Sequence, residues 1–245
     1  MTDLHTHILP GIDDGAKNRE ESRELLKLQT ENGVERVVLT PHFNCERTDL
    51  TDFLSKRATA FQTTLEILDD ATMPQIKVGA EVRYSPALLR LDLAGLTLGE
   101  SSYLLLELPG QHYPAHLEQV VVNLGMMGIT PILAHLERYK YFKDQPQLLF
   151  KLIQQGALGQ VSVLSLFEKS TKSFAMACLK NSLAQIVASD AHNITVRPPC
   201  MAKLNDVLEP ELLQKTELFA KAVWDNELTP FFQPYAVKKG IFGYS

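Results

Sequence analysis

The sequence is poor in cysteine, and its few cysteines show no pattern that would pair them. Three occur in 245 residues, at Cys45, Cys178 and Cys200, and none of them forms a Cys-x-x-Cys motif. An odd, scattered set favours reduced thiols over a disulfide framework. No arginine stands six residues after any of the three. The lack of this cysteine–arginine spacing excludes the class of phosphate-cleaving enzymes in which a thiolate is the nucleophile.

The sequence also lacks an excess of positive charge and any long apolar run. Lysine and arginine number 24 against 29 acidic residues, so the net charge is −5. Nucleic-acid binding requires cationic side chains that neutralise phosphates, and this acidic balance argues against such a partner. No apolar segment approaches the length of a membrane span, and the first residues carry no export signal. We therefore expect a cytoplasmic protein that does not insert into membranes and whose oligomeric state is open.

Short apolar segments rich in β-branched residues alternate along the chain with longer segments of helical period. The predicted strands cover residues 2–5, 35–40, 75–82, 102–108, 130–134, 159–165 and 185–188. The predicted helices cover residues 19–31, 52–69, 114–127, 146–155, 169–181 and 210–226. Strands separated by helices of this length imply parallel pairing through crossovers. This alternation predicts an α/β fold, a distorted (β/α)7 TIM-like barrel formed by residues 1–245 as a single domain.

The chain opens with the motif Asp3-x-His5-x-His7. Alternate residues of a strand face the same side, so His5 and His7 can point at one metal ion. Imidazole together with carboxylate suits divalent transition metals, and no thiolate biases the motif toward a structural zinc site. A lone histidine pair of this kind is more often structural than metal-binding, so the motif needs support from elsewhere in the sequence.

That support comes from the carboxyl ends of the predicted strands. Six of the seven strands carry an ionisable residue there, and α/β barrels place their active sites at this end. Taken singly, such residues are often surface histidines, acids in ion pairs or helix caps. Burying so many together without a metal would be costly, so their recurrence predicts a metal cluster. The nine predicted ligands are His5, His7, Asp14, His42, Glu81, Glu107, His135, Asp190 and His192.

Nine ligands are too many for one ion, so we expect a multinuclear site. In the expected arrangement Asp14, His42 and His192 hold one ion, His5, His7 and Asp190 a second, and Glu107 and His135 a third, with Glu81 bridging two of them. Such sites suit in-line displacement at phosphorus, because the metals supply a hydroxide at neutral pH and neutralise charge on the attacking and leaving oxygens. The sequence therefore favours hydrolysis of a phosphate ester.

Two arginines closely follow these predicted ligands. Arg138 comes three residues after His135, and Arg197 comes five residues after His192. A guanidinium matches the geometry of phosphate and can bind it through two parallel hydrogen bonds. A loop arginine is otherwise most often a surface ion-pair partner. The position directly after a metal ligand favours phosphate binding for both arginines.

Other conspicuous residues receive a structural interpretation. His112 and His116 fall at the entry to a helix and not at a strand end. Met126, Met127 and Trp224 lie in segments of helical period and are interpreted as core residues. None of these five is assigned to the metal cluster.

The motifs resemble the PHP (polymerase and histidinol phosphatase) superfamily and, within it, the bacterial capsule-type manganese-dependent protein-tyrosine phosphatases. The most specific segment is His-Ile-Leu-Pro-Gly-Ile-Asp-Asp-Gly, which begins at His7. The other matching segments are Thr40-Pro41-His42, Gly79-Ala80-Glu81-Val82, Leu106-Glu107-Leu108-Pro109, Pro131-Ile132-Leu133-Ala134-His135, Glu137-Arg138-Tyr139 and Ser189-Asp190-Ala191-His192-Asn193. Leu136 departs from the proline usual there, the loop Ser165-Leu166-Phe167-Glu168 lacks a glycine, and no match is recognised after Pro198.

The resemblance implies a distorted seven-stranded barrel with three divalent ions, usually manganese, with zinc, iron or magnesium as alternatives. It implies hydrolysis of phosphotyrosine on a protein, typically a bacterial tyrosine autokinase that controls capsule or exopolysaccharide synthesis. Carried over by matching position, the same nine residues are the metal ligands, and Arg138 and Arg197 bind the phosphate.

Three other functions stay open on the sequence alone. One is the hydrolysis of a small phosphorylated metabolite such as histidinol phosphate. A second is an amidohydrolase-like reaction, although that class usually bridges its metals with a modified lysine, and here the central strands end in Glu81 and Glu107. The third is a non-catalytic module in which metals hold the fold or a partner. The complete set of ligands argues against this third function.

Overall fold

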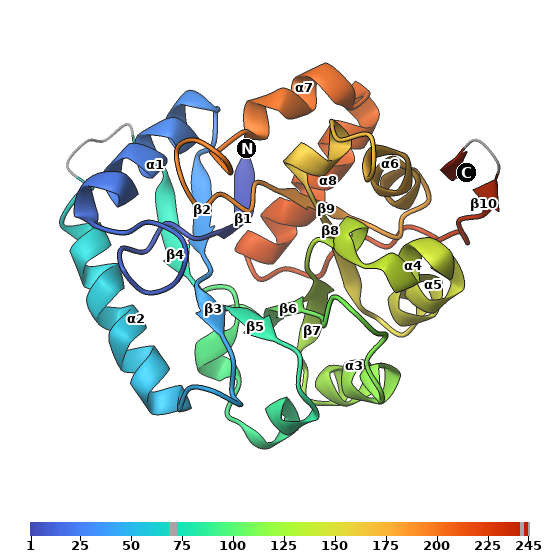
Figure 1. Cartoon of the computed structure of the whole chain (residues 1–245), viewed down its shortest axis with the longest axis horizontal. Helices are drawn as coiled ribbons and strands as arrows, with labels where there is room; N and C mark the ends of the chain where they lie inside the picture. Colours follow the sequence, from blue (N-terminus) through green and yellow to red (C-terminus); the bar gives the residue numbers. More distant parts are fainter. Residues whose placement is uncertain (69–72, 241–242, 245) are drawn as a thin grey trace.

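The computed structural model describes residues 1–68, 73–240 and 243–244. Its central strands stand around a barrel whose outer face is covered by helices (Figure 1). These strands are β1 (Thr2–Thr6), β2 (Arg36–Leu39), β3 (His42–Phe43), β4 (Gln75–Val78), β5 (Glu81–Arg83), β6 (Tyr103–Glu107), β7 (Thr130–Leu133), β8 (Leu158–Ser162) and β9 (Ile186–Ala188). They pair in parallel, in the orders β1-β2-β4 and β3-β5-β6-β7-β8-β9.

The first and last of these strands close the barrel. Thr6 and Ala191 form a parallel bridge, and the amide of His7 donates to the carbonyl oxygen of Ala191 at 2.8 Å. The amide of Asp190 donates to the carbonyl oxygen of His5 at 3.0 Å. β2 and β3 are two parts of one barrel strand, as are β4 and β5, since each pair is separated by only two residues. The predicted distorted barrel with seven strands is therefore confirmed.

The prediction of one continuous strand over residues 75–82 is wrong, because the strand is broken at Gly79 and Ala80. A β-carbon on Gly79 would lie only 2.9 Å from the carbonyl oxygen of Thr97, so the neighbouring segment approaches the backbone closely there. The carbonyl oxygen of Gly79 accepts a hydrogen bond of 2.7 Å from Nη1 of Arg57. β4 pairs with β2 and β5 pairs with β3, so both parts follow the same neighbouring barrel strand, and Glu81 opens β5, which also pairs with β6.

The helices follow the predicted segments, α1 with the predicted bounds and the others with shifted ends. The longer ones are α1 (Arg19–Glu31), α2 (Leu50–Leu65), α3 (Leu117–Met126), α5 (Pro146–Gln154), α6 (Lys172–Lys180) and α8 (Pro210–Trp224). Shorter ones are α4 (Lys140–Asp144), α7 (Leu204–Val207) and the 3-10 helices η1 (Pro86–Arg90), η2 (Ala94–Leu96), η3 (Leu136–Arg138), η4 (Val163–Leu166) and η5 (Met201–Lys203). Position 69, the end of the predicted helix 52–69, lies outside the described residues.

Particular side chains set where these elements start and stop. The side chain of Asn18 accepts a hydrogen bond from the amide of Glu21 at 2.9 Å and so caps α1. α3 begins at Leu117, later than predicted, because His116 has a φ of 63°, which is left-handed and incompatible with a helix. The strand predicted over residues 159–165 ends at Ser162, where η4 begins.

The helices bury apolar stripes against the barrel, and these stripes test the predictions that Trp224 and the pair Met126 and Met127 are core residues. Trp224 is buried, as predicted. The interpretation of Met126 and Met127 as core residues is wrong, because they are 75% and 46% exposed. A helix buries residues spaced three and four apart, and in α3 these are Leu117, Val120, Val121 and Leu124. The two methionines lie off this stripe, at the end of the helix.

The C-terminal part differs from the barrel. After α8 the chain forms no described helix or strand until the hairpin of β10 (Lys239–Gly240) and β11 (Gly243–Tyr244). The hydroxyl of Tyr244 donates to the carbonyl oxygen of Lys143 at 2.9 Å, and its ring meets Phe174, so β11 lies beside α4 and α6 (Figure 1). Among the described residues, no helix has both the length and the apolar character needed to cross a membrane.

Candidate metal centre

All nine predicted ligands gather at the carboxyl ends of the barrel strands. They are His5 of β1, His7 and Asp14 after β1, His42 of β3, Glu81 of β5, Glu107 of β6, His135 after β7, and Asp190 and His192 after β9. Three sets of their ligand atoms lie within 4.8 Å of one another: His7, Asp14, His42 and His192; His5, His7 and Glu81; and His42, Glu81 and Glu107. The sets overlap, so the seven ligands that they contain form one continuous cluster. Asp190 joins this cluster through its contact with His5, and His135 joins it through its contact with Glu81.

Glu81 lies at the centre of the cluster. Its Oε2 is 3.3 Å from Nε2 of His5, 3.3 Å from Nε2 of His7 and 2.9 Å from Nδ1 of His42. Its Oε1 is 2.9 Å from Nε2 of His135. Burial alone would raise the pKa of Glu81, but the surrounding imidazoles hold that pKa well below its ordinary value. One carboxylate thus contacts four imidazoles, which is the position expected of a bridging ligand.

Asp190 forms a second buried carboxylate beside the same imidazoles. Its Oδ1 is 3.3 Å from Nε2 of His5, 3.6 Å from Nε2 of His7 and 3.4 Å from Nδ1 of His192. Burial would raise the pKa of Asp190, but the charge of His5 lowers it. Conversely, burial would lower the pKa of His5, and the facing carboxylates raise it to about 9. In the inner part of the cluster, the pKa values of the carboxylates and of the imidazoles therefore depend strongly on one another.

The outer part of the cluster opens toward solvent. The Oδ1 atom of Asp14, which is largely exposed, lies 3.3 Å from Nε2 of His42 and 3.5 Å from Nε2 of His192. The rings of His7 and His192 stack with centroids 3.8 Å apart. Burial lowers the pKa of His192 to about 4, and the charge of His7 adds to this effect. His7 thus faces both the inner and the outer groups, whereas the sequence placed it only with His5 and Asp190.

The imidazole nitrogens of the cluster fit divalent metal ions. The Nε2 atoms of His5 and His7 face each other at 3.1 Å. Nδ1 of His7 lies 2.7 Å from a carboxylate oxygen of Asp13 and so takes the ring proton of a neutral imidazole, which leaves a lone pair on Nε2. Nε2 of His192 is buried without a hydrogen-bond partner among the described residues. Buried nitrogens are rarely left unpaired, so converging lone pairs and carboxylates are the donor set of a transition-metal site.

Both predicted phosphate-binding arginines lie at this cluster. Nη2 of Arg138 donates to Oδ2 of Asp190. Nη1 of Arg197 is 3.7 Å from the same oxygen, and its Nη2 is 3.2 Å from Oδ2 of Asp14. Both guanidinium groups therefore border the opening of the site while they pair with predicted metal ligands.

Left-handed backbone at two strand ends directs these side chains. His135, directly after Ala134, has a φ of 35°, and Asp190 has a φ of 54°. Such values are uncommon for residues other than glycine and cluster at functional sites. At each strand end the chain therefore turns sharply, and the residues on both sides of the turn can face the barrel opening.

Sequence reasoning did not assign a role to Asp13, which directly supports the cluster. One of its carboxylate oxygens lies 2.7 Å from Nδ1 of His7 and also accepts the amide of His42 at 3.1 Å. Burial would raise the pKa of Asp13, but its contact with His7 lowers that pKa to about 2. Carboxylates of this kind fix the tautomer and orientation of a metal-binding histidine. The signal was available, because Asp13 precedes Asp14 in the Gly-Ile-Asp-Asp-Gly segment.

Gln160 of β8 is a second supporting residue that the sequence did not reveal. Its Oε1 accepts the amide of His135 at 2.8 Å and lies 3.3 Å from Nδ1 of His5. It therefore connects a residue after β7 with a residue of β1 from inside the barrel. A single glutamine in an apolar strand carries no pattern that would distinguish this role.

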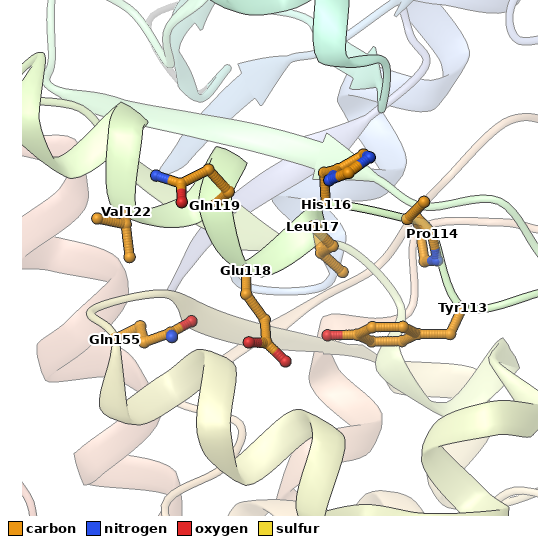
Figure 2. Close-up of a pocket in the computed structure, with 9 residues that line it drawn as sticks. Tyr113, Pro114, His116, Leu117, Glu118, Gln119, Val122 and Gln155 are labelled. Atoms are coloured by element: carbon orange, nitrogen blue, oxygen red, sulfur yellow. The ribbon is translucent and has the colours of Figure 1, made fainter.

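One predicted ligand has a second ion-pair partner, and two other histidines lie outside the cluster. Glu107 pairs with Arg83 through an Nη1–Oε2 distance of 3.0 Å, which is the ion pair that a purely structural interpretation would give it. His112 and His116 are exposed and do not join the nine. His116 instead lines a separate hollow of about 440 Å³ beside Tyr113, Glu118 and Gln155 (Figure 2).

A parallel α/β barrel with clustered imidazoles and carboxylates at its strand ends is an architecture of metal-dependent hydrolases. The model of the family described as "Capsular polysaccharide synthesis, CpsB/CapC" matches residues 1–226. The chain belongs to this family. The match extends beyond Pro198, where the sequence motifs alone gave no further resemblance.

Several curated relatives and solved structures are similar to this chain. The tyrosine-protein phosphatase YwqE of Bacillus subtilis is 32% identical over 80% of this chain and 79% of its own length. The tyrosine-protein phosphatase CpsB of Streptococcus pneumoniae is 33% identical over 85% of this chain and 89% of its own length. A chain from the crystal structures of YwqE and CpsB, described as unique metal-dependent tyrosine phosphatases, superimposes with a TM-score of 0.86 at 29% identity, over 97% of this chain and 100% of its own.

A more distant structure shares the fold. The histidinol phosphate phosphatase of Lactococcus lactis, solved with zinc, L-histidinol and phosphate, has a TM-score of 0.54 at 14% identity, covering 88% of this chain and 94% of its own. The barrel predicted from the PHP resemblance is thus found both in the family and in this distant protein.

Proposed function

We propose that this chain is a metal-dependent protein-tyrosine phosphatase that hydrolyses phosphotyrosine. The observation that carries the proposal is the single cluster of nine candidate ligands with Arg138 and Arg197 at its edge. The printed names of the relatives, tyrosine-protein phosphatases YwqE and CpsB, supply the substrate class. An α/β barrel with this cluster and two guanidinium groups is suited to a phosphate ester.

We further propose that three manganese ions occupy the cluster. Imidazole nitrogens and carboxylate oxygens without thiolate suit manganese, and zinc, iron or magnesium are alternatives with the same donors. His5, His7, Glu81 and Asp190 would hold the inner ions, and Asp14, His42 and His192 an outer one, with Glu107 and His135 completing the set. When bound, such ions activate water at neutral pH and neutralise charge on the phosphate oxygens.

The partner in this proposal is a cytoplasmic phosphotyrosine protein, a bacterial tyrosine autokinase that controls capsule or exopolysaccharide synthesis. The capsular descriptions of the family and of its relative CapC from Staphylococcus aureus, which is 34% identical over 83% of this chain and 82% of its own length, support this assignment. The acidic balance of the chain agrees with a protein partner and not a nucleic acid.

The protein's own residues position and orient the reacting groups. Arg138 and Arg197, now paired with Asp190 and Asp14, would exchange these carboxylates for the non-bridging phosphate oxygens. Asp13 keeps the proton of His7 on Nδ1 and thereby presents Nε2 to the metal side. A phenol leaves with a pKa of roughly 10, so its departure needs less help from a general acid than an alkyl alcohol does.

Metal-stripped protein tests the proposal. Manganese, zinc or magnesium is restored in turn, and hydrolysis of a phosphotyrosine peptide, a phosphoserine peptide and histidinol phosphate is measured. We expect manganese to restore activity with preference for the phosphotyrosine peptide. The variant Glu81→Gln, which keeps the shape of the central carboxylate, should lose both metal and activity and so controls for contaminating phosphatases. Activity confined to histidinol phosphate, or none with any metal, would contradict the proposal.

A further inference from the structure

The segment from His192 to Arg197 is a closed turn held by one side chain. Oδ1 of Asn193 accepts hydrogen bonds from the amides of Thr195, Val196 and Arg197 at 3.1, 2.7 and 3.2 Å. The carbonyl oxygen of Arg197 in turn accepts the amides of His192 and Asn193 at 2.9 and 3.2 Å. The turn is therefore internally bonded at both ends, and its conformation is defined by contacts within it.

This turn carries a charged side chain that contacts the cluster and two apolar side chains that are exposed to solvent. Arg197 reaches Asp14 and Asp190 at the cluster. Ile194 and Val196 are 44% and 77% exposed, although both are apolar. Branching at the β-carbon restricts the rotamers of both residues, so they lose little freedom when something binds them. A rigid pair of apolar side chains thus stands directly beside a predicted phosphate-binding arginine.

The apolar character extends to the neighbouring strand end. Phe167 follows η4 after β8, the strand that pairs with β9, and its ring is also exposed. Nζ of Lys203 lies 5.8 Å from the centre of that ring. The ring of Phe167 thus adds a second exposed apolar group, with a positive charge beside it, after the strand that pairs with β9.

We propose that Ile194 and Val196 form a specificity element that binds an apolar side chain next to the phosphotyrosine of a polypeptide substrate. The inference rests on the proposed tyrosine-phosphatase function and adds the substrate feature that the site reads. Because the ring of a phosphotyrosine separates its phosphate from its backbone, the residues on either side must cross the rim when Arg197 holds the phosphate. A small phosphorylated metabolite has no such neighbours and gains nothing from the pair.

Two peptides test the element. The peptides share one sequence around a phosphotyrosine and differ only in the two residues that flank the phosphotyrosine, which are leucine in one peptide and serine in the other. Phenyl phosphate, which has no flanking residues, reports on the metal site alone. We expect manganese-loaded wild-type protein to prefer the leucine peptide by about tenfold in kcat/KM, the size of discrimination that one apolar contact gives. In the double variant Ile194→Ser and Val196→Ser this preference should fall to near unity, mainly through KM.

The matched control is Leu228→Ser, which removes an apolar side chain that is 97% exposed in the segment after α8. It should keep the wild-type preference. Equal hydrolysis of the two peptides by the wild type, or an unchanged preference in the double variant, overturns the inference and leaves the proposed function standing. Hydrolysis of phenyl phosphate with neither peptide cleaved overturns the protein substrate itself, and the specificity element with it.

Discussion

Two turns of this barrel place an arginine at the same carboxylate by different means. The turn after β7 runs from His135 to Tyr139, and the turn after β9 runs from Asp190 to Arg197. Each has a left-handed residue near the strand end, and each brings a guanidinium to Asp190. Both turns therefore place a guanidinium beside Asp190, but different interactions hold the two turns in place.

The turn after β7 is held by packing. Tyr139 is buried, its hydroxyl accepts the amide of Leu108 at 2.9 Å, and its ring stacks on Tyr141 and meets Phe142 edge-on. The turn after β9 has exposed side chains and is held by the amide oxygen of Asn193. One arginine is thus positioned by the hydrophobic core and the other by local hydrogen bonds. The comparison indicates that two arginines with the same proposed role can be held by turns that contribute differently to the stability of the fold.

The largest effect is expected from the arginines themselves. Arg138→Ala and Arg197→Ala should each lower kcat on a phosphotyrosine peptide by about 10²–10³-fold, the usual loss when one preorganised donor to a reacting oxyanion is removed. Metal content should remain at the wild-type level, because neither residue is a predicted ligand. Steady-state kinetics together with metal analysis checks both points. Undiminished activity in either variant would end the proposed equivalence of the two turns.

A smaller effect should distinguish the two turns by how much each contributes to the free energy of unfolding. Tyr139→Phe leaves the buried amide of Leu108 without its acceptor, which costs about 1–3 kcal/mol in free energy of unfolding. Asn193→Ala removes the oxygen that accepts amides of an exposed turn, where water can take its place, so Tm should change less than in Tyr139→Phe. Activity should fall, because the turn no longer holds Arg197 in position. Thermal unfolding and kinetics on both variants provide the measurement. A larger loss of Tm in Asn193→Ala than in Tyr139→Phe would reverse the comparison.

The smallest expected effect is the release of protons when metal ions bind. In the metal-free protein, His5 and His7 have a pKa of about 9 and are protonated at neutral pH, whereas the pKa of His192, at about 4, leaves it neutral. Metal binding requires neutral imidazole, so loading should release protons from His5 and His7 but none from His192. The apparent affinity for manganese should therefore rise as pH increases toward 9. Calorimetry in buffers of different ionisation enthalpy measures the release, and buffer-independent heats would contradict it.

The sequence predicted the barrel and the composition of the cluster because both follow from local patterns. An ionisable residue after an apolar strand marks the carboxyl end of that strand, and parallel pairing then brings such residues together. The break at Gly79 was not predictable, because it depends on the approach of Thr97 from a distant segment. The exposure of Met126 depends on which stripe of α3 meets the barrel.

The supporting residues were harder to predict than the ligands. Asn193 stood in a recognised motif, yet its side chain accepts hydrogen bonds from the amides of Thr195, Val196 and Arg197, and only the three-dimensional turn reveals this. Gln160 contacts residues of two other elements, and its role depends on the closure of the barrel. The identity of the metals, the partner kinase and the extent of the domain stay predictions.

The bridge between Thr6 and Ala191 has a consequence for synthesis of the chain. The two strands that close the barrel are separated by nearly the whole sequence, so β1 leaves the ribosome long before its partner β9 exists. Contacts of such high sequence separation form late and slowly. Since Asp190 and His192 lie beside this closure, the nascent chain cannot complete the cluster before the barrel itself is closed. The proposed metal ligands can therefore come together as a full set only after most of the chain has been synthesised.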